Sequence, residues 1–124
     1  AATKKANCTL LHVWATWCSI CIEEMPALLR MLSANQKIRP ILIDVSHPIS
    51  QKCFSIPWMQ RLSPPFTTYL KPAGDDGKYL AAIDANWSGA LPYFALYDRG
   101  RRKKVWIGEV DLTSLRKELE ELCQ

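Results

Sequence analysis

The feature that most constrains this chain is a pair of cysteines, Cys18 and Cys21, placed where a predicted strand becomes a predicted helix. Residues 9–16 (TLLHVWAT) are rich in aliphatic, aromatic and β-branched side chains, which is typical of a buried strand. Across residues 19–34, apolar side chains recur at three- and four-residue spacing, and this periodicity predicts an amphipathic helix. The two thiols therefore lie at the start of a helix that directly follows a core strand.

The junction between strand and helix is a position that suits thiol chemistry. Unpaired N–H groups and the positive end of the dipole at a helix N-terminus stabilise a thiolate at Cys18. Cys21, one turn into the helix, is within reach of the Cys18 sulfur, so the two can form and break a disulfide. A C-x-x-C pair can also be structural or bind a metal, but its place after a buried strand favours redox chemistry.

The rest of the chain predicts one domain of mixed secondary structure. Its 124 residues are 48% hydrophobic, which excludes a disordered chain. No apolar run approaches the roughly 18 residues of a membrane span, and neither a repeat nor a low-complexity linker divides residues 1–124. The patterns predict a strand over 38–45, a helix over 50–62, an extended segment over 66–73, a helix over 78–87, strands over 92–97 and 103–107, and a last helix capped by Asp111. We expect an α/β fold in which a central mixed β-sheet, with its first two strands parallel, is flanked by helices.

Three segments together resemble the thioredoxin superfamily. Residues 13–26 (VWATWCSICIEEMP) are similar to its active-site segment, and are most similar to that of the TlpA/ResA-like thiol–disulfide oxidoreductases. Residues 89–92 (GALP) resemble the cis-proline segment, and Asp98-Arg99-Gly100, Gly108 and the last helix resemble the C-terminal half. The resemblance spans about residues 9 to 122, and it implies a thioredoxin fold.

The resemblance also implies roles for individual residues. Cys18 would be the exposed nucleophile and Cys21 the resolving thiol, with their disulfide as the only redox group and no separate cofactor or metal. Pro92 would be cis and face the dithiol, and the backbone of Leu91 would bind an extended segment of a partner. Trp17 would shield one side of the site.

Two further residues have a supporting role in this interpretation. Glu24 matches an acidic residue that shuttles a proton or raises the pKa of a thiol, and a solvated glutamate is an equal alternative. His12 falls where thioredoxins have a buried acid. A neutral imidazole could accept the Cys21 proton and an imidazolium could favour the Cys21 thiolate, but we favour a satisfied core histidine without a catalytic role.

Five cysteines cannot all pair within one molecule. In the implied fold, Cys8 and Cys123 lie at the end away from the dithiol, where a disulfide is open to them and two free thiols are the favoured interpretation. Cys53 is expected near the active-site end. It could be a third redox thiol, and the default interpretation is a buried, inert residue. A metal-binding module, with zinc or copper(I) on Cys18, Cys21, His47 and Cys53, and a non-catalytic docking module remain as alternatives.

Partners and compartment follow from the resemblance. It implies a monomer that reduces protein disulfides outside the cytoplasm of a bacterium, in its periplasm or an equivalent space, and receives electrons from an upstream thiol donor. Whether that donor lies in the membrane, and whether a tether anchors the full-length protein, stays open; residues 1–7 show no signal peptide. The net charge is +4, and the basic run over 99–104 is interpreted as a solvated hairpin tip and not a nucleic-acid site. Whether the protein reduces or oxidises its clients is not determined by the motif.

Overall fold

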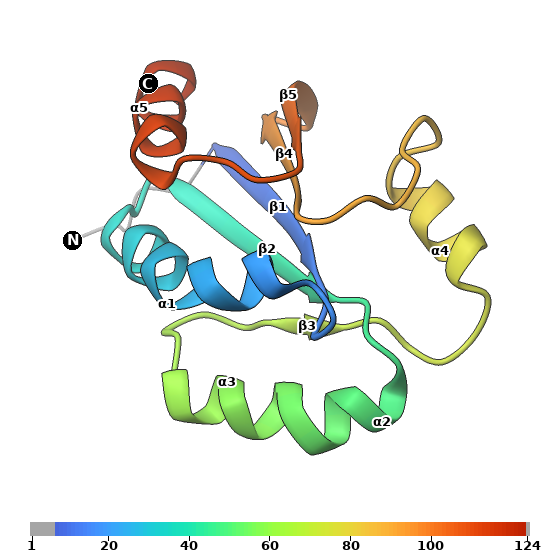
Figure 1. Ribbon diagram of the computed structural model, residues 1–124. Helices are drawn as coiled ribbons and strands as arrows, with labels where there is room; N and C mark the ends of the chain where they lie inside the picture. Colours follow the sequence, from blue (N-terminus) through green and yellow to red (C-terminus); the bar gives the residue numbers. More distant parts are fainter. Residues whose placement is uncertain (1–6, 124) are drawn as a thin grey trace.

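Five strands form one mixed sheet in the order β3-β2-β1-β4-β5 (Figure 1). In the computed structural model, which describes residues 7–123, they are β1 (Cys8–Trp14), β2 (Ile38–Asp44), β3 (Tyr69–Leu70), β4 (Tyr93–Asp98) and β5 (Arg101–Ile107). β1 pairs in parallel with β2 and antiparallel with β4, while β2 pairs in parallel with β3 and β4 antiparallel with β5. The predicted mixed sheet and its parallel first pair are confirmed.

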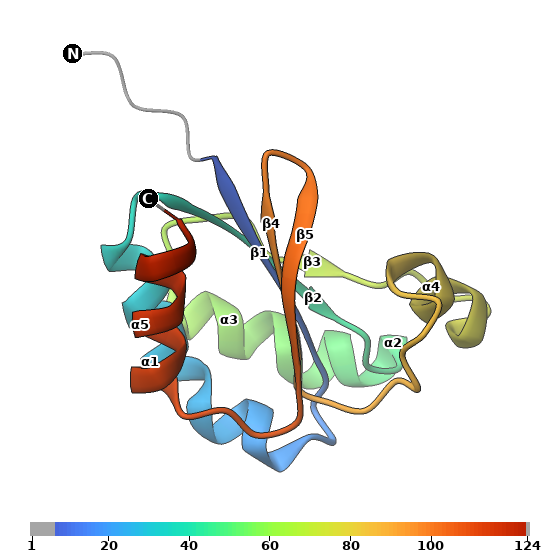
Figure 2. The ribbon, with the colours of Figure 1, turned by 90° about the horizontal axis from the view of Figure 1, so that it is seen from above.

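Helices cover both faces of this sheet (Figure 2). They are α1 (Ser19–Ala34), α2 (Pro48–Ser50), the π-helical turn η1 (Gln51–Ser55), α3 (Ile56–Leu62), α4 (Asp76–Ile83) and α5 (Leu112–Leu122). One core cluster joins one face of β1 and β4 to α1, α3 and α5, and a second joins the opposite face to α4. Within residues 7–123, no helix combines the length and the apolar character that crossing a bilayer requires.

β1 is the centre of the molecule because it is buried on both faces. Leu10 and Trp14 belong to the cluster under α1, whereas Val13 belongs to the cluster under α4, and all three are at most 1% exposed. A strand buried on both sides has no reason to alternate polar and apolar residues, and this explains the almost continuous apolar run over residues 9–16. β1 therefore leads through the core to the two cysteines.

The predicted elements are present, but several boundaries are shifted. The extended segment expected over 66–73 is a strand only at Tyr69–Leu70, and the strand expected over 103–107 begins at Arg101. The helix expected over 50–62 begins at Pro48 and contains the π-helical turn η1. The helix expected over 78–87 starts at Asp76, because the Asp75 carboxylate caps it by accepting from the Lys78 N–H. It stops at Ile83 because Asp84 is extended and its carboxylate accepts from the Asn86 N–H, which competes with the helix.

The two ends of the described chain are joined, contrary to the favoured expectation of free thiols. Cys8 begins β1 and Cys123 follows α5, and the two form a disulfide with their Cα atoms 6.0 Å apart. This Cα separation is in the usual range for a disulfide, because β1 starts at the end of the molecule where α5 finishes. Residues 1–6, with most of the segment considered for a signal peptide, lie outside the described residues.

Candidate active site

The Cys18–Cys21 pair lies at the N-terminus of α1. The two residues form a disulfide with their Cα atoms 5.3 Å apart. Cys18 is the N-cap of the helix, and its Sγ accepts a hydrogen bond from the Cys21 N–H at 3.2 Å. The helix N-terminus that would stabilise a Cys18 thiolate is thus aimed at that sulfur.

The two cysteines differ less in solvent exposure than the sequence suggests. Cys18 was expected to be exposed, yet it is only 8% exposed in the disulfide, while Cys21 is fully buried. The side chain that projects into solvent is the neighbouring indole of Trp17, which is 68% exposed.

The segment before β4 lies at the same end of the sheet. Val13 pairs with Tyr93 in the β1–β4 ladder, so Pro92 precedes β4 beside the point where β1 leads toward Cys18. The Leu91–Pro92 peptide bond is cis, and the Pro92 carbonyl accepts from the Gly108 N–H at 2.9 Å. Leu91 packs against the cluster that contains both cysteines. The cis bond that the resemblance implies is therefore present at this residue.

Glu24 is half-buried one turn beyond Cys21. Its Oε1 atom is buried without a hydrogen-bond partner. Burial, and secondarily the negative charge of Glu109, raise the pKa of Glu24 to about 7. A carboxyl group with this pKa can both take up and release a proton near neutral pH. The sequence reasoning missed Glu109, although it directly follows Gly108, one of the landmarks of the resemblance.

His12 lies on β1 and is completely buried. Its Nδ1 lies 3.1 Å from the Tyr93 carbonyl oxygen, to which it donates, and its ring stacks on Phe94 with 4.2 Å between centroids. Burial lowers the pKa of His12 to about 4, and the hydrogen bond to Tyr93 opposes this only in part. The ring is therefore neutral at neutral pH, which leaves no imidazolium to favour a Cys21 thiolate. It is also not fully satisfied, because Nε2 has no partner.

Cys53 is exposed, so the expectation of a buried thiol is wrong. It lies on η1, whose buried residues are Gln51 and Ser55, and this places Cys53 on the outer side of the turn. His47 is also exposed, and its Nδ1 caps α2 by accepting from the Ile49 N–H. No cluster of three potential metal ligands occurs among residues 7–123, so the proposed site of Cys18, Cys21, His47 and Cys53 is not assembled.

The basic run is exposed, as a solvated hairpin tip requires. Residues 101–104 start β5 at the edge of the sheet, and all four are exposed. Two of them are paired, however: Lys104 with Glu118 on α5, and Arg102 with Asp84 beyond α4. These pairs join β5 to both neighbouring helical elements.

Comparisons with known proteins identify the fold. No protein-family model matches this sequence, and no curated protein does. Among solved structures, a thiol:disulfide interchange protein of the thioredoxin family from Chlorobium tepidum matches with a TM-score of 0.75 and 15% identity, covering 97% of this chain and 82% of its own. StoA from Bacillus subtilis matches with a TM-score of 0.69 and 19% identity, covering 92% of this chain and 83% of its own. The exposed lipoprotein thioredoxin Etrx1 from Streptococcus pneumoniae matches with a TM-score of 0.69 and 21% identity, covering 94% of this chain and 86% of its own. By its strand order, its helical layers and these likenesses, the chain has the thioredoxin fold.

Proposed function

We propose that this protein is a thiol–disulfide oxidoreductase that reduces disulfides in proteins outside the cytoplasm. The observation that carries the proposal is the Cys18–Cys21 disulfide at the N-terminus of α1, beside the cis Leu91–Pro92 segment. A short-range disulfide in this place combines a stabilised leaving thiolate with a backbone segment that can hold a partner. The solved structures that the chain resembles include one described as a disulfide oxidoreductase and one described as a thiol:disulfide interchange protein.

The reaction cycle starts from the reduced dithiol. The Cys18 thiolate attacks one sulfur of the substrate disulfide, which forms a mixed disulfide and releases the first substrate thiolate. The Cys21 thiolate then attacks the Cys18 sulfur and releases the second substrate thiolate. Two electrons pass to the substrate, and the protein is left with the Cys18–Cys21 disulfide. A donor dithiol must reduce that disulfide before the next cycle.

Cys21 must lose a proton before it can attack. Glu24 supports this step because its pKa of about 7 makes its carboxylate available at neutral pH, one helical turn from Cys21. The neutral His12 ring, with a free Nε2 in the same core, is a second candidate acceptor. We assign the main role to Glu24 because its half-buried side chain can exchange the proton with solvent, whereas His12 is enclosed.

Substrate binding is proposed at the backbone of Leu91. An extended segment of a substrate protein would form strand-like hydrogen bonds there, and the exposed Trp17 would cover its side chains. Protein substrates suit the apolar rim around a largely buried Cys18 better than a small charged disulfide does.

An oxidising compartment is favoured by the second disulfide. Cys8 and Cys123 are bridged at the other end of the molecule, and such permanent bridges persist mainly outside the reducing cytoplasm. A structural match from Mycobacterium tuberculosis is described as secreted and the Streptococcus pneumoniae match as an exposed lipoprotein. We extend this location to the present chain.

Insulin reduction tests the proposal. The protein should accelerate the reduction of insulin by dithiothreitol, and Cys18→Ser should abolish the acceleration because the attacking sulfur is missing. Cys53→Ser is the matched control, since it removes an exposed thiol that belongs to neither disulfide, and its loss should leave the rate unchanged. Acceleration that survives in Cys18→Ser would contradict the assignment of the nucleophile.

The reduction potential of the Cys18–Cys21 pair decides the direction. Equilibration with glutathione buffers should give a value near the reducing end, about −270 mV or lower, if the protein donates electrons. A value near −120 mV would instead make it an oxidant of protein thiols and overturn the reductive direction.

A further inference from the structure

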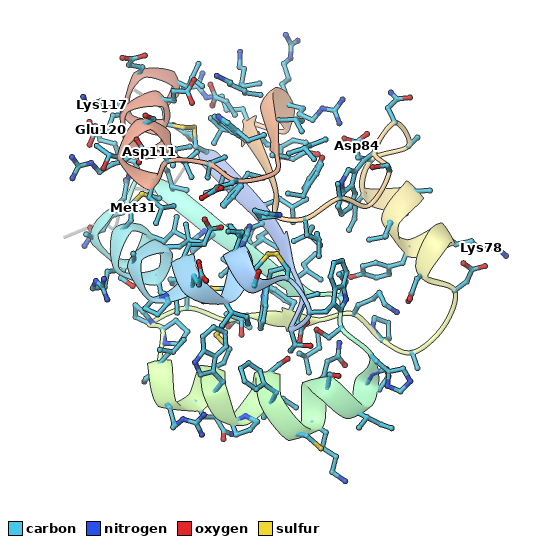
Figure 3. All side chains as sticks on the ribbon, viewed as in Figure 1. Met31, Lys78, Asp84, Asp111, Lys117 and Glu120 are labelled. Carbon is cyan, nitrogen blue, oxygen red and sulfur yellow. A yellow bond between two sulfur atoms is a disulfide. The ribbon has the colours of Figure 1, made fainter. Side chains whose placement is uncertain are left out.

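A buried carboxylate beyond the end of α4 connects the cis-proline segment to the edge of the sheet. One oxygen of Asp84, Oδ2, accepts from the Tyr93 hydroxyl at 2.9 Å and is paired with Arg102 Nη1 at 3.0 Å. The other oxygen accepts from the Asn86 N–H at 3.0 Å. The Asp84 side chain is only 7% exposed, and Figure 3 places it between α4 and the β4–β5 hairpin. We call Asp84, Tyr93 and Arg102 the anchor.

The anchor holds the residue that directly follows the cis-proline. Tyr93 is completely buried, and its ring packs on Trp87 with 4.2 Å between centroids. The Trp87 indole N–H in turn donates to the Ala90 carbonyl oxygen at 2.9 Å. Residues 88–92 are therefore tied at both flanks, to Trp87 on one side and to Tyr93 on the other.

A further contact restrains the same segment from β5. The Pro92 carbonyl oxygen accepts from the Gly108 N–H, and Gly108 follows β5, the strand that carries Arg102. Gly89 has a φ of +93°, and a Cβ at this position would lie 3.3 Å from Leu80 Cδ1 on α4, so the chain passes close to the helix here. The path of residues 88–92 thus depends on α4 and β5 together.

Charge makes the anchor more than ordinary packing. The hydrogen bonds from Asn86 and Tyr93, and more weakly the charge of Arg102, keep the pKa of Asp84 below its usual range, so the carboxylate is ionised at neutral pH. A hydrogen bond to an ionised acceptor is stronger and more directional than one between neutral groups. The Tyr93 hydroxyl is thereby fixed, and with it the start of β4.

We propose that Asp84, Tyr93 and Arg102 are positioning residues that set the backbone of residues 88–92 for binding protein substrates. This inference rests on the proposed function, because it assumes that the Leu91 backbone holds an extended segment next to the substrate disulfide. Leu91 packs against the cluster of Cys18 and Cys21, so a shift of its backbone moves the bound segment relative to the Cys18 sulfur. The anchor therefore determines affinity for a protein disulfide without touching it.

Steady-state kinetics on Tyr93→Phe test the inference. This substitution keeps the ring on Trp87 and removes only the hydroxyl that binds Asp84. With insulin as substrate and dithiothreitol as donor, KM should rise roughly tenfold, by a misplacement of the binding segment, while kcat changes far less. Asp84→Ala should reproduce the effect, and Asp84→Asn, which keeps one acceptor oxygen but loses the charge that pairs with Arg102, should raise KM less than Asp84→Ala does.

Tyr97→Phe is the matched control. Tyr97 lies on the same strand and packs on the same cluster, but it is four residues further from Pro92. Its KM should equal that of the wild type. Hydrogen exchange adds a readout without chemistry, because the Ala90 and Leu91 amides should exchange faster in Tyr93→Phe than in Tyr97→Phe.

The outcomes separate the two proposals. A wild type that does not reduce insulin contradicts the proposed function. A wild type that does, with Tyr93→Phe lowering thermal stability but leaving KM and the two exchange rates at control values, shows that the anchor only stabilises the fold and overturns the inference.

Discussion

The two disulfides lie at opposite ends of β1 and differ in their surroundings more than in their burial (Figure 3). Cys8 and Cys123 are 2% and 7% exposed, and Cys18 and Cys21 are 8% and 0% exposed, so burial alone does not say which pair exchanges. The Cys18–Cys21 pair is 3 residues apart, and it has a helix N-terminus, a half-buried carboxyl group and an exposed indole beside it. The Cys8–Cys123 pair is 115 residues apart and joins the start of a strand to the end of a helix. A disulfide acquires its role from the groups around it and from the length of chain that it closes.

Removal of the long-range disulfide gives the largest effect on stability that we expect. The double substitution Cys8→Ser with Cys123→Ser should lower the free energy of unfolding by about 2–5 kcal/mol, since a cross-link that closes most of the chain strongly restricts the unfolded state. Insulin reduction should be unchanged, because this pair lies at the far end of β1. Chemical denaturation and the insulin assay measure the two quantities.

The matched double substitution at the other end should have the reverse profile. Cys18→Ser with Cys21→Ser closes no long loop, so its loss of stability should be smaller, while disulfide exchange disappears. Equal losses of stability at the two ends would break the contrast between a cross-link and a reactive pair.

The pH dependence of stability tests His12, which lies on β1 between the two disulfides. Its pKa is lowered to about 4 in the fold from 6.5, so the unfolded chain binds a proton over this range and the folded protein does not. His12 therefore makes the free energy of unfolding depend on pH. Its contribution is fully present above about pH 6.5, and up to about 3 kcal/mol is lost as the pH falls toward 4. His12→Gln should remove this part of the slope, whereas substitution of the exposed His47 by Gln should not. An unaltered slope in His12→Gln would show that other groups cause it.

At the dithiol end, we expect Glu24 to cause a smaller pH dependence of stability, of opposite sign to that of His12. Because its pKa is raised from 4.5 to about 7, the folded protein holds the proton more tightly than the unfolded chain. Stability should fall as the pH rises through this range, moderately, since the side chain is half exposed to solvent. Glu24→Gln should flatten that decline and slow the release of substrate from the mixed disulfide above neutral pH. Glu23→Gln, an exposed neighbour, is the control, and identical curves for both variants would remove Glu24 from the mechanism.

Sequence patterns predicted most of the fold and the position of Cys18 and Cys21 where a strand leads into a helix. The strand before Cys18, the helix that begins at Ser19 and the cap of the last helix at Asp111 are all present, because each depends on periodicity or capping within a few residues. The roles of Cys18, Cys21, Trp17 and Leu91 stay predictions for the experiments above. The boundary at Ile83 was missed, since it depends on an aspartate that bonds its own backbone.

The sequence by itself determined most of the strands and helices and the place of Cys18 and Cys21 at a strand-to-helix junction, because hydrophobic period and helix ends are local properties. Only the tertiary structure decided that Cys8 meets Cys123, that Cys53 faces solvent and that Asp84 holds Tyr93. Each of these contacts depends on where a helix lies on the sheet, which the packing of two core clusters sets for the whole chain at once. Sequence separation does not indicate which distant residues come into contact, so these contacts can be identified only in the assembled fold.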